Sequence, residues 1–325
     1  MAFAEALVRK RNQSGGSVLI GLLESLGRGT VARRVRDAME GAGLKIASSE
    51  KIDLALKPKA KEPATSYFIR NKWSQFSESL KSRASQLTFT PEVIQVLVDQ
   101  AQAEKIQDAY HSLSIENYRV SESMIAAIAS GQWDPEEKKD VVNRFAAKGY
   151  LDAFNLVTRE ALRDAILWQR GETPIEEMCE ILLGLVIGIK RRLFAPMADV
   201  GLIDPSDLES YRNQPVFIRG SNHIPMNHTK VAEAMQGVML AAADEQNPYI
   251  RAALAHFFIG YVHPFGDGNG RTSRFLMNYI RLVAGLPWII IPVERRSEYL
   301  LGLEKMSMQD FPSTFFDFLL SLERD

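Results

Sequence analysis

The chain has 325 residues, of which 46% are hydrophobic and 24% are charged, and both values are typical of a globular protein. Its formal net charge of −1 gives the molecule as a whole no electrostatic preference for nucleic acid or for an anionic membrane. The one cysteine, Cys179, excludes an internal disulfide framework and fits a reducing compartment. We expect it to be a small buried side chain.

The sequence predicts neither a signal peptide nor a membrane span. The basic residues from Arg9 to Arg11 are followed by polar residues and glycines, not by the apolar stretch that a signal peptide requires. The longest apolar run, Ile181 to Ile189, is far shorter than the roughly 20 residues that cross a bilayer. We therefore expect a soluble cytoplasmic protein with no membrane partner.

The first 63 residues differ in composition from the rest. The first sixty contain eleven Lys or Arg residues against six Asp or Glu residues. Ser14 to Ser17 indicates a flexible stretch, Lys57 to Pro63 a linker, and Val31 to Gly41 a short basic helix between them. We predict a basic region with a small helical module over residues 1–63. It is either a nucleic-acid-binding module or a solvated helical face, and the second interpretation is favoured.

From residue 64 to the C-terminus the pattern is helical, so we predict a mainly α domain. Thr90-Pro91-Glu92 indicates a helix start, with a capping hydroxyl, a proline and an acid in the first turn. Val216 to Ile218 is one of the few strand-like runs. Further helices are predicted at 162–169, 175–189, 229–243, 248–262, 271–284, 296–305 and 312–322.

One segment stands apart: residues 263–274, with the sequence HPFGDGNGRTSR. It lies between two helical patterns, so a glycine-rich loop leads directly into a helix N-terminus. The first backbone N–H groups of a helix have no internal partner, and the helix dipole attracts negative charge there. Gly268 and Gly270 allow close approach of a phosphate. Arg271 and Arg274, three residues apart, add guanidinium groups that match phosphate oxygens.

The same segment contains groups for proton transfer and for metal binding. His263 has a near-neutral intrinsic pKa and can accept a proton from an attacking hydroxyl. Asp267 offers a hard oxygen ligand for Mg²⁺, and Asn269 a neutral donor. We expect Phe265 to hold the loop in the core. The spacing is one residue short of a P-loop and has Arg271 where that motif has lysine, so the segment is not a P-loop.

The segment resembles, residue for residue, the Fic-family motif H-P-F-x-[DE]-G-N-G-R-x-x-R. So many fixed positions make the match far more specific than most short patterns. The resemblance extends as a helical pattern over roughly Tyr67 to Leu322. It implies a Fic (Fido) fold, a mainly α-helical core with a small β-hairpin flap.

The resemblance also implies an activity and a role for each motif residue. The enzyme would transfer AMP from ATP to a Ser, Thr or Tyr hydroxyl of a target protein and release pyrophosphate. His263 would be the general base, Asp267 would hold Mg²⁺ on the phosphates, and Arg274 would hold the γ-phosphate. The anion hole around the α- and β-phosphates would be formed by Gly268, Asn269, Gly270 and Arg271.

The resemblance extends to the target and adenine sites. Residues 215–226 resemble the family's flap, whose edge aligns a target segment by strand addition. The flap residues expected to bind the target are Val216, Phe217, Ile218 and His223. Without the resemblance, the sequence of residues 215–226 predicts an ordinary hairpin. Relatives have a tyrosine pair in the helix after the motif helix, whereas this chain has Tyr299 and Leu300. We expect Tyr299 to stack on the base, although the missing second ring weakens the case for ATP.

A second, less specific pattern suggests self-inhibition. Many Fic proteins carry [ST]-x-x-x-E-[GN] on a helix that plugs the nucleotide site, and Ser112, Glu116 and Asn117 fit it. We predict an inhibitory helix around residues 105–118, N-terminal to the core as in class II Fic proteins. Glu116 would pair with Arg274 and repel nucleotide phosphates. The alternative is a solvent-facing glutamate at a helix end.

Three other functions stay open at this point. The chain could remove AMP from modified targets, because in some relatives the same glutamate positions water for that reaction. It could transfer another phosphate-linked group from a different donor. It could also be a nucleic-acid-binding regulator that uses residues 1–60, with the Fic core as a sensor or toxin module. A homodimer is a further expectation.

Overall fold

The protein is described by a computed structural model. The described residues are 13–25, 29–44, 62–85, 87, 92–132, 140–171 and 173–323. The chain divides into two compact units, Met1–Glu62 and Pro63–Asp325. Of the predicted linker at Lys57 to Pro63, only the last two residues are described.

The first unit is a helix pair with its own small core. It contains α2 (Gln13–Ser25) and α3 (Gly29–Gly41). Ile20, Val35 and Met39 are buried between the two helices. The basic helix predicted at Val31 to Gly41 is confirmed as part of α3. The flexible stretch predicted at Ser14 to Ser17 is wrong, because those residues form the first turns of α2, whose apolar side chains pack on α3.

The second unit is built from helices, and the part of the chain that the structure describes contains no strand. Its α-helices are α4 (Ala64–Ala84), α5 (Ile94–Ile115), α6 (Glu122–Ala129), α7 (Val141–Arg170), α8 (Ile175–Asp199), α9 (Val231–Asp244), α10 (Pro248–Val262), α11 (Asn269–Val283), α12 (Arg296–Gln309) and α13 (Ser313–Leu320). The mainly α fold predicted from the sequence is confirmed.

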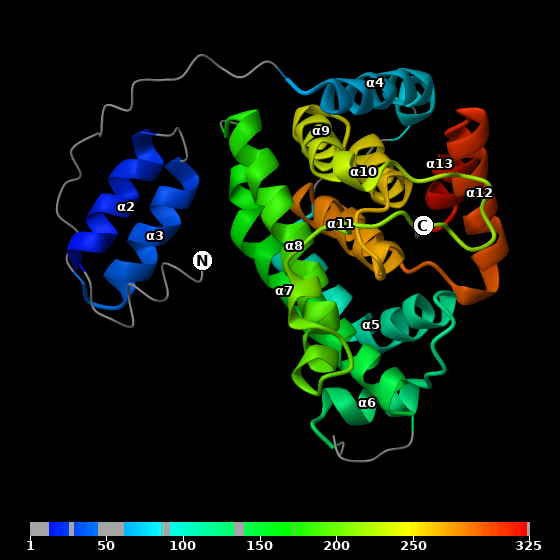
Figure 1. The fold of residues 1–325 in the computed structure, drawn as a ribbon, viewed down its shortest axis with the longest axis horizontal. Helices are drawn as coiled ribbons and strands as arrows, with labels where there is room; N and C mark the ends of the chain where they lie inside the picture. Colours follow the sequence, from blue (N-terminus) through cyan, green and yellow to red (C-terminus); the bar gives the residue numbers. More distant parts are fainter. Residues whose placement is uncertain are drawn as a thin grey trace. The chain divides into compact units, whose positions relative to one another are not determined.

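The helices surround α11 (Figure 1). The long helices α7 and α8 pack along each other, α10 packs along α11, and α4 packs along α9. Helix α11 also contacts α5, α7 and α8, so nearly all its residues are buried, including Arg271 and Arg274. Charged side chains inside a core are costly unless they meet polar partners. Their presence on the most buried helix indicates a functional centre.

Two local predictions are wrong. Helix α5 begins at Ile94 and not at the predicted Thr90, which lies outside the described residues; Glu92 is not helical. The backbone N–H of Glu92 donates instead to the Gly285 carbonyl, 3.1 Å away, which holds this residue outside the helix. The strand predicted at Val216 to Ile218 is also not formed.

The segment that contains this predicted strand, residues 213–227, is an extended loop with a turn at Gly220, whose φ of +79° is in the left-handed region. Its contacts run through side chains to neighbouring helices, not through a strand ladder. Phe217 is 83% exposed and Ile224 is 74% exposed, so the hydrophobic residues that suggested a strand are not buried by a partner strand.

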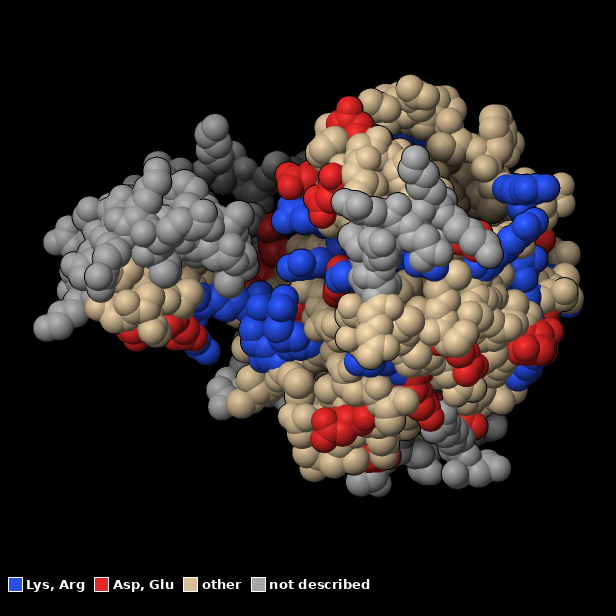
Figure 2. Space-filling view, turned by 90° about the horizontal axis from the view of Figure 1, so that it is seen from below, with Lys and Arg blue, Asp and Glu red and all other residues tan. Residues whose placement is uncertain are grey.

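Two predictions from composition can be compared with the structure. Cys179 is confirmed as a free, buried side chain. No helix in the described part of the chain is long and apolar enough to cross a membrane. Figure 2 shows Lys and Arg side chains next to Asp and Glu side chains over the larger body, without a wide field of one sign. This distribution agrees with the near-zero net charge.

Candidate active site

The glycine-rich segment forms the connection between α10 and α11. Helix α10 ends because His263 takes a left-handed conformation, with φ of +52°, and donates its N–H to the Ile259 carbonyl at 2.9 Å. Phe265 is 1% exposed, which confirms that it holds the loop in the core. The Asn269 side chain fastens the loop to itself, accepting from the Phe265 N–H at 3.0 Å and donating to the Phe265 carbonyl at 2.8 Å.

The start of α11 admits close neighbours because it contains glycines. Gly268 is the N-cap, with φ of +85°, and a Cβ there would lie 2.6 Å from the Phe194 ring. A Cβ on Gly270 would lie 2.1 Å from the Glu116 Oε1 atom. The first turn of α11 therefore carries a carboxylate against its backbone. This is the place where the helix dipole and the free N–H groups favour an anion.

The Glu116 carboxylate is also paired with Arg274. The Arg274 Nη2 atom donates to Glu116 Oε1 at 2.8 Å, and its Nε atom donates to the Ser112 hydroxyl at 2.8 Å. Nη2 also donates to the Ser112 carbonyl at 3.1 Å. Burial is the largest single influence and lowers the pKa of Arg274, but Glu116, Tyr299 and Tyr150 together raise it overall. The predicted contact between Glu116 and Arg274 is thus present in the structure.

The end of α5 explains why the pattern around Glu116 has its spacing. Glu116 is the C-cap, and Asn117 follows with φ of +66°, a conformation that glycine and asparagine adopt more readily than other residues. The Asn117 N–H donates to the Ser114 carbonyl at 3.0 Å, and the Tyr118 N–H to the Leu113 carbonyl at 3.1 Å. These bonds form a Schellman motif. It ends the helix so that Glu116 projects toward α11, one turn beyond Ser112.

Arg271 lies in a different environment from Arg274. Its side chain is fully buried, with the guanidinium 4.8 Å from the ring centroids of both Tyr118 and Phe194. Its Nη2 atom is 3.4 Å from Asp267 Oδ1. The Nε and Nη1 atoms are buried and have no hydrogen-bond partner among the described residues. Unpaired buried donors are costly, so they mark a group prepared for an anionic ligand.

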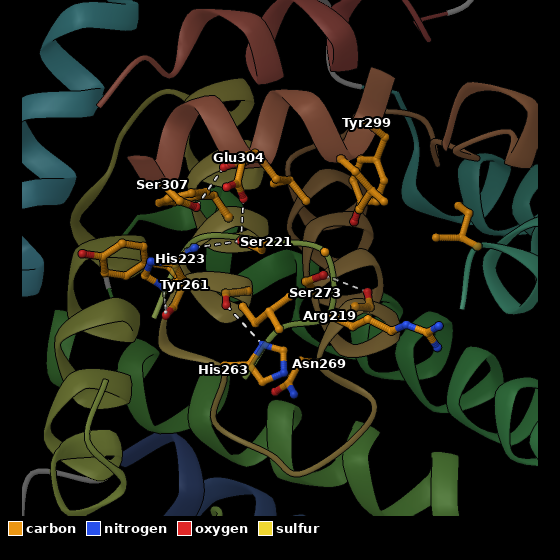
Figure 3. A pocket seen from close by; sticks show the side chains of 18 of the residues that line it. Arg219, Ser221, His223, Tyr261, His263, Asn269, Ser273, Tyr299, Glu304 and Ser307 are labelled. Carbon is orange, nitrogen blue, oxygen red and sulfur yellow. Dashed lines mark hydrogen bonds between the residues drawn. The ribbon is translucent and has the colours of Figure 1, made fainter. Parts of the chain in front are cut away.

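His263 lies beside this anion site with one ring nitrogen engaged. Its Nδ1 atom is 3.3 Å from the Gly260 carbonyl, a contact drawn in Figure 3. A hydrogen on Nδ1 leaves Nε2 as an acceptor. Burial lowers the pKa of His263 below 6.5, while the bond to Gly260 acts in the opposite direction. The ring is therefore neutral at physiological pH, as a general base requires.

Asp267 is the residue best suited to a metal ion. Its side chain is 66% exposed, and its Oδ1 atom accepts from the Gly268 N–H at 2.5 Å. Among the residues that the structure describes, no three His, Cys, Asp or Glu side chains gather as a metal-binding cluster. Mg²⁺ commonly uses one or two carboxylates together with substrate phosphates, so a single exposed carboxylate beside an anion site fits that ion.

A cavity of about 380 Å³ opens next to His263 and the first turn of α11. Figure 3 shows its wall, formed by α12 and by the loop that carries Ser221 and His223. Leu300 lines it, and Tyr299 lines it from a buried position, with its hydroxyl 2.9 Å from His256 Nε2 and 3.4 Å from Arg274 Nη1. The size is in the range of small-molecule sites. The stacking predicted for Tyr299 stays a prediction.

The loop expected to be a flap is fastened at its tip. The Glu304 carboxylate of α12 accepts from the Ser221 hydroxyl and, at 2.8 Å, from the Asn222 N–H. The His223 Nε2 atom is 2.8 Å from the Tyr261 carbonyl, and the two rings stack with centroids 4.4 Å apart. Ile218 lines the cavity, whereas Phe217 points into solvent. The loop thus presents an edge beside His263.

Sequence reasoning missed three residues that support the site. Arg212 bonds to the backbone around His263, Lys190 donates to the Asp267 carbonyl at 3.2 Å, and the buried His256 lies between Tyr299 and Ser273. Burial lowers the pKa of Lys190 to about 8. A lone basic residue carries no periodic signal, so only the fold reveals these contacts.

The comparisons with known proteins agree with this geometry. Residues 158–280 match the model of the Fic/DOC family. The chain is 30% identical over 210 residues to protein adenylyltransferase fic-1 of Caenorhabditis elegans, covering 62% of this chain and 36% of that protein. It is 28% identical over 249 residues to protein adenylyltransferase Fic of Drosophila erecta, covering 74% and 45%. The chain thus spans less than half the length of these curated relatives.

Solved structures show the same fold. A fragment of Fic-1 from C. elegans aligns with a TM-score of 0.55 at 20% identity, covering 89% of this chain and 74% of that one. A Fic-domain-containing signaling protein from Bacteroides thetaiotaomicron aligns with a TM-score of 0.54 at 18% identity, covering 80% and 92%.

Proposed function

We propose that this chain, of which residues 158–280 match the Fic/DOC family model, transfers AMP from ATP to a hydroxyl side chain of a target protein. The observation that carries this proposal is the place of Glu116, whose carboxylate lies against the first turn of α11 and pairs with Arg274. The protein's own carboxylate therefore lies in a site that fits phosphate oxygens.

The reaction uses groups already held in position. The target hydroxyl attacks the α-phosphorus, and its proton passes to the Nε2 atom of His263. A bond forms between the hydroxyl oxygen and the α-phosphorus, the bond from that phosphorus to the bridging oxygen breaks, and pyrophosphate leaves. Catalysis comes from positioning and from charge stabilisation at the start of α11.

The phosphates have distinct contacts in this proposal. The backbone N–H groups from Asn269 to Arg271 surround the α- and β-phosphates, and the two buried unpaired nitrogens of Arg271 supply further donors. Arg274 takes the γ-phosphate once Glu116 releases it. Asp267 would hold Mg²⁺, an ion that would supply positive charge next to the phosphate oxygens. The adenine enters the cavity of about 380 Å³, beside Tyr299 and Leu300.

Glu116 supports two further proposals. By holding Arg274, it keeps ATP from binding productively, so the resting protein is inhibited. Its side chain is 33% exposed beside the anion site, where a carboxylate can also orient a water molecule. Removal of AMP from modified targets is therefore the second candidate activity, and it requires Glu116. Nucleic-acid binding through residues 1–60 and homodimer formation stay predictions.

Intact mass after incubation with ATP and Mg²⁺ tests the proposal on three proteins. They are the parent, Glu116→Gly, and Glu116→Gly combined with His263→Ala. We expect AMP adducts on Glu116→Gly, few on the parent and none on the double variant. Equal labelling of Glu116→Gly and the double variant would refute the role of His263. If Glu116→Gly gains no adduct from any nucleoside triphosphate, alone or with cell extract as target, the transfer activity is wrong.

A further inference from the structure

The loop of residues 213–227 is joined to the catalytic loop by one buried side chain, Arg212, which is 9% exposed. Its Nη1 atom donates to the Gln214 carbonyl at 2.9 Å, and its Nη2 atom donates to the Met226 carbonyl. These two carbonyls lie near the two ends of the loop. One guanidinium therefore holds the loop's ends together.

The same guanidinium holds the end of α10. Its Nε atom donates to the His263 carbonyl at 2.7 Å, and Nη2 is 3.4 Å from the Val262 carbonyl. The Arg212 backbone N–H donates to the Pro264 carbonyl at 2.9 Å. Carbonyls at a helix C-terminus lack intrahelical partners and carry partial negative charge, so a cation there is favourable.

We propose that Arg212 is the positioning residue that fixes the loop of residues 213–227, which receives the target, relative to the general base His263. This inference rests on the proposed function, because it takes His263 as the base and the loop as the target's docking edge. Arg212 does not line the cavity of about 380 Å³ in which the adenine is placed.

The loop's other contacts lead elsewhere, which makes Arg212 separable from them. Glu304 of α12 holds Ser221 and Asn222 at the tip, and His223 bonds to the Tyr261 carbonyl. None of these side chains bonds to the backbone of residues 262–264. Loss of the Arg212 side chain should leave the tip attached and free the ends of the loop.

Arginine suits this position better than lysine. Its planar fork directs several N–H groups at once, and here three nitrogen atoms reach four carbonyls. A lysine would keep the positive charge and a subset of these bonds. The charge of Arg212 also affects the base. Burial has the largest effect and lowers the pKa of His263, and the bond to Gly260 raises it. Arg212 and His223 lower this pKa further, and Glu116 raises it.

The test uses Arg212→Met and Arg212→Lys, with Arg192→Met, an exposed arginine of α8, as the control. Hydrogen exchange is followed over residues 213–227 and over the rest of the chain. We expect exchange in this loop to quicken by about tenfold or more in Arg212→Met, less in Arg212→Lys, and not in Arg192→Met. Unchanged exchange in the loop, or equal acceleration throughout the chain, would overturn the proposal.

Two further measurements separate positioning from a general structural role. By NMR, the pKa of His263 should rise in Arg212→Met and stay near the parent value in Arg212→Lys; a parent-like pKa in both would count against the proposal. In the Glu116→Gly background, Arg212→Met should slow AMP transfer and leave the affinity for ATP unchanged. An equal loss of transfer rate and ATP affinity would overturn the proposal. Exchange and pKa need no transfer activity, so they remain decisive if the proposed function fails.

Discussion

Replacing Glu116 with glycine should raise the proposed AMP transfer by an amount that the structure allows us to estimate. Arg274 is 5% exposed at its side chain and Glu116 is 33% exposed, so the pair is partly screened by solvent. A hydrogen bond to a charged group contributes about 1.5–3 kcal/mol, and partial exposure favours the lower end, about 1.5–2 kcal/mol. Since about 1.4 kcal/mol is a factor of ten, freeing Arg274 should raise productive ATP binding roughly 10–30-fold.

The assay is the initial rate of self-labelling at ATP concentrations well below saturation, followed by intact mass. Glu116→Gln, which keeps an acceptor oxygen but loses the charge, should lie between the parent and Glu116→Gly. Glu122→Ala, an exposed glutamate at the start of α6, is the matched control and should match the parent. A Glu116→Gly rate within about twofold of the parent would refute the reasoning, because Arg274 would then not be held back by Glu116.

Three other predictions follow from contacts in the core of the site. His263→Ala should lower transfer by about 10²–10⁴-fold with ATP affinity unchanged by calorimetry, and the parent rate should rise with pH through the lowered pKa of His263. Gly270→Ala should abolish labelling even in the Glu116→Gly background, since its methyl group would lie where the Glu116 carboxylate now lies, the place proposed for phosphate; retained labelling would contradict this. Burial raises the pKa of Asp108 to about 6, so its protonated form stabilises the fold below pH 3.8 and that stability is lost as pH rises through 6. The free energy of unfolding of the parent should therefore fall between pH 4 and pH 7. In Asp108→Asn, which can still accept from Tyr150, this fall should be smaller by about 2–4 kcal/mol, as measured by denaturant titration at the two pH values.

The sequence predicted the parts of the site that are encoded locally. Residues 263–274 are contiguous, and the left-handed Gly268 and the close approach of Glu116 to Gly270 both belong to one helix start. The α5 end was predicted from the resemblance to the inhibitory pattern, and the structure shows that Glu116 is the C-cap and Asn117 the left-handed residue after it. Each signal needs only a few neighbouring residues.

Contacts between distant residues could not be predicted in this way. Arg212 and Lys190 reach the motif loop from other segments, and the environment of Arg271 depends on Tyr118 and Phe194. The hairpin prediction failed because strand formation depends on a pairing partner, and the alternating hydrophobic residues near Phe217 do not specify one. The flexible stretch predicted at Ser14 to Ser17 was wrong for a similar reason, because packing between α2 and α3 outweighed the local composition.

In the proposed reaction the transferred group is AMP, and it comes from the α-phosphate of ATP. The most direct test gives Glu116→Gly two forms of ATP, one radiolabelled at the α-phosphate and one at the γ-phosphate, and measures protein-bound label with His263→Ala in the same background as the blank. We expect label from α-labelled ATP alone, and we expect that label to depend on His263. Label from γ-labelled ATP would show phosphoryl transfer and contradict this expectation.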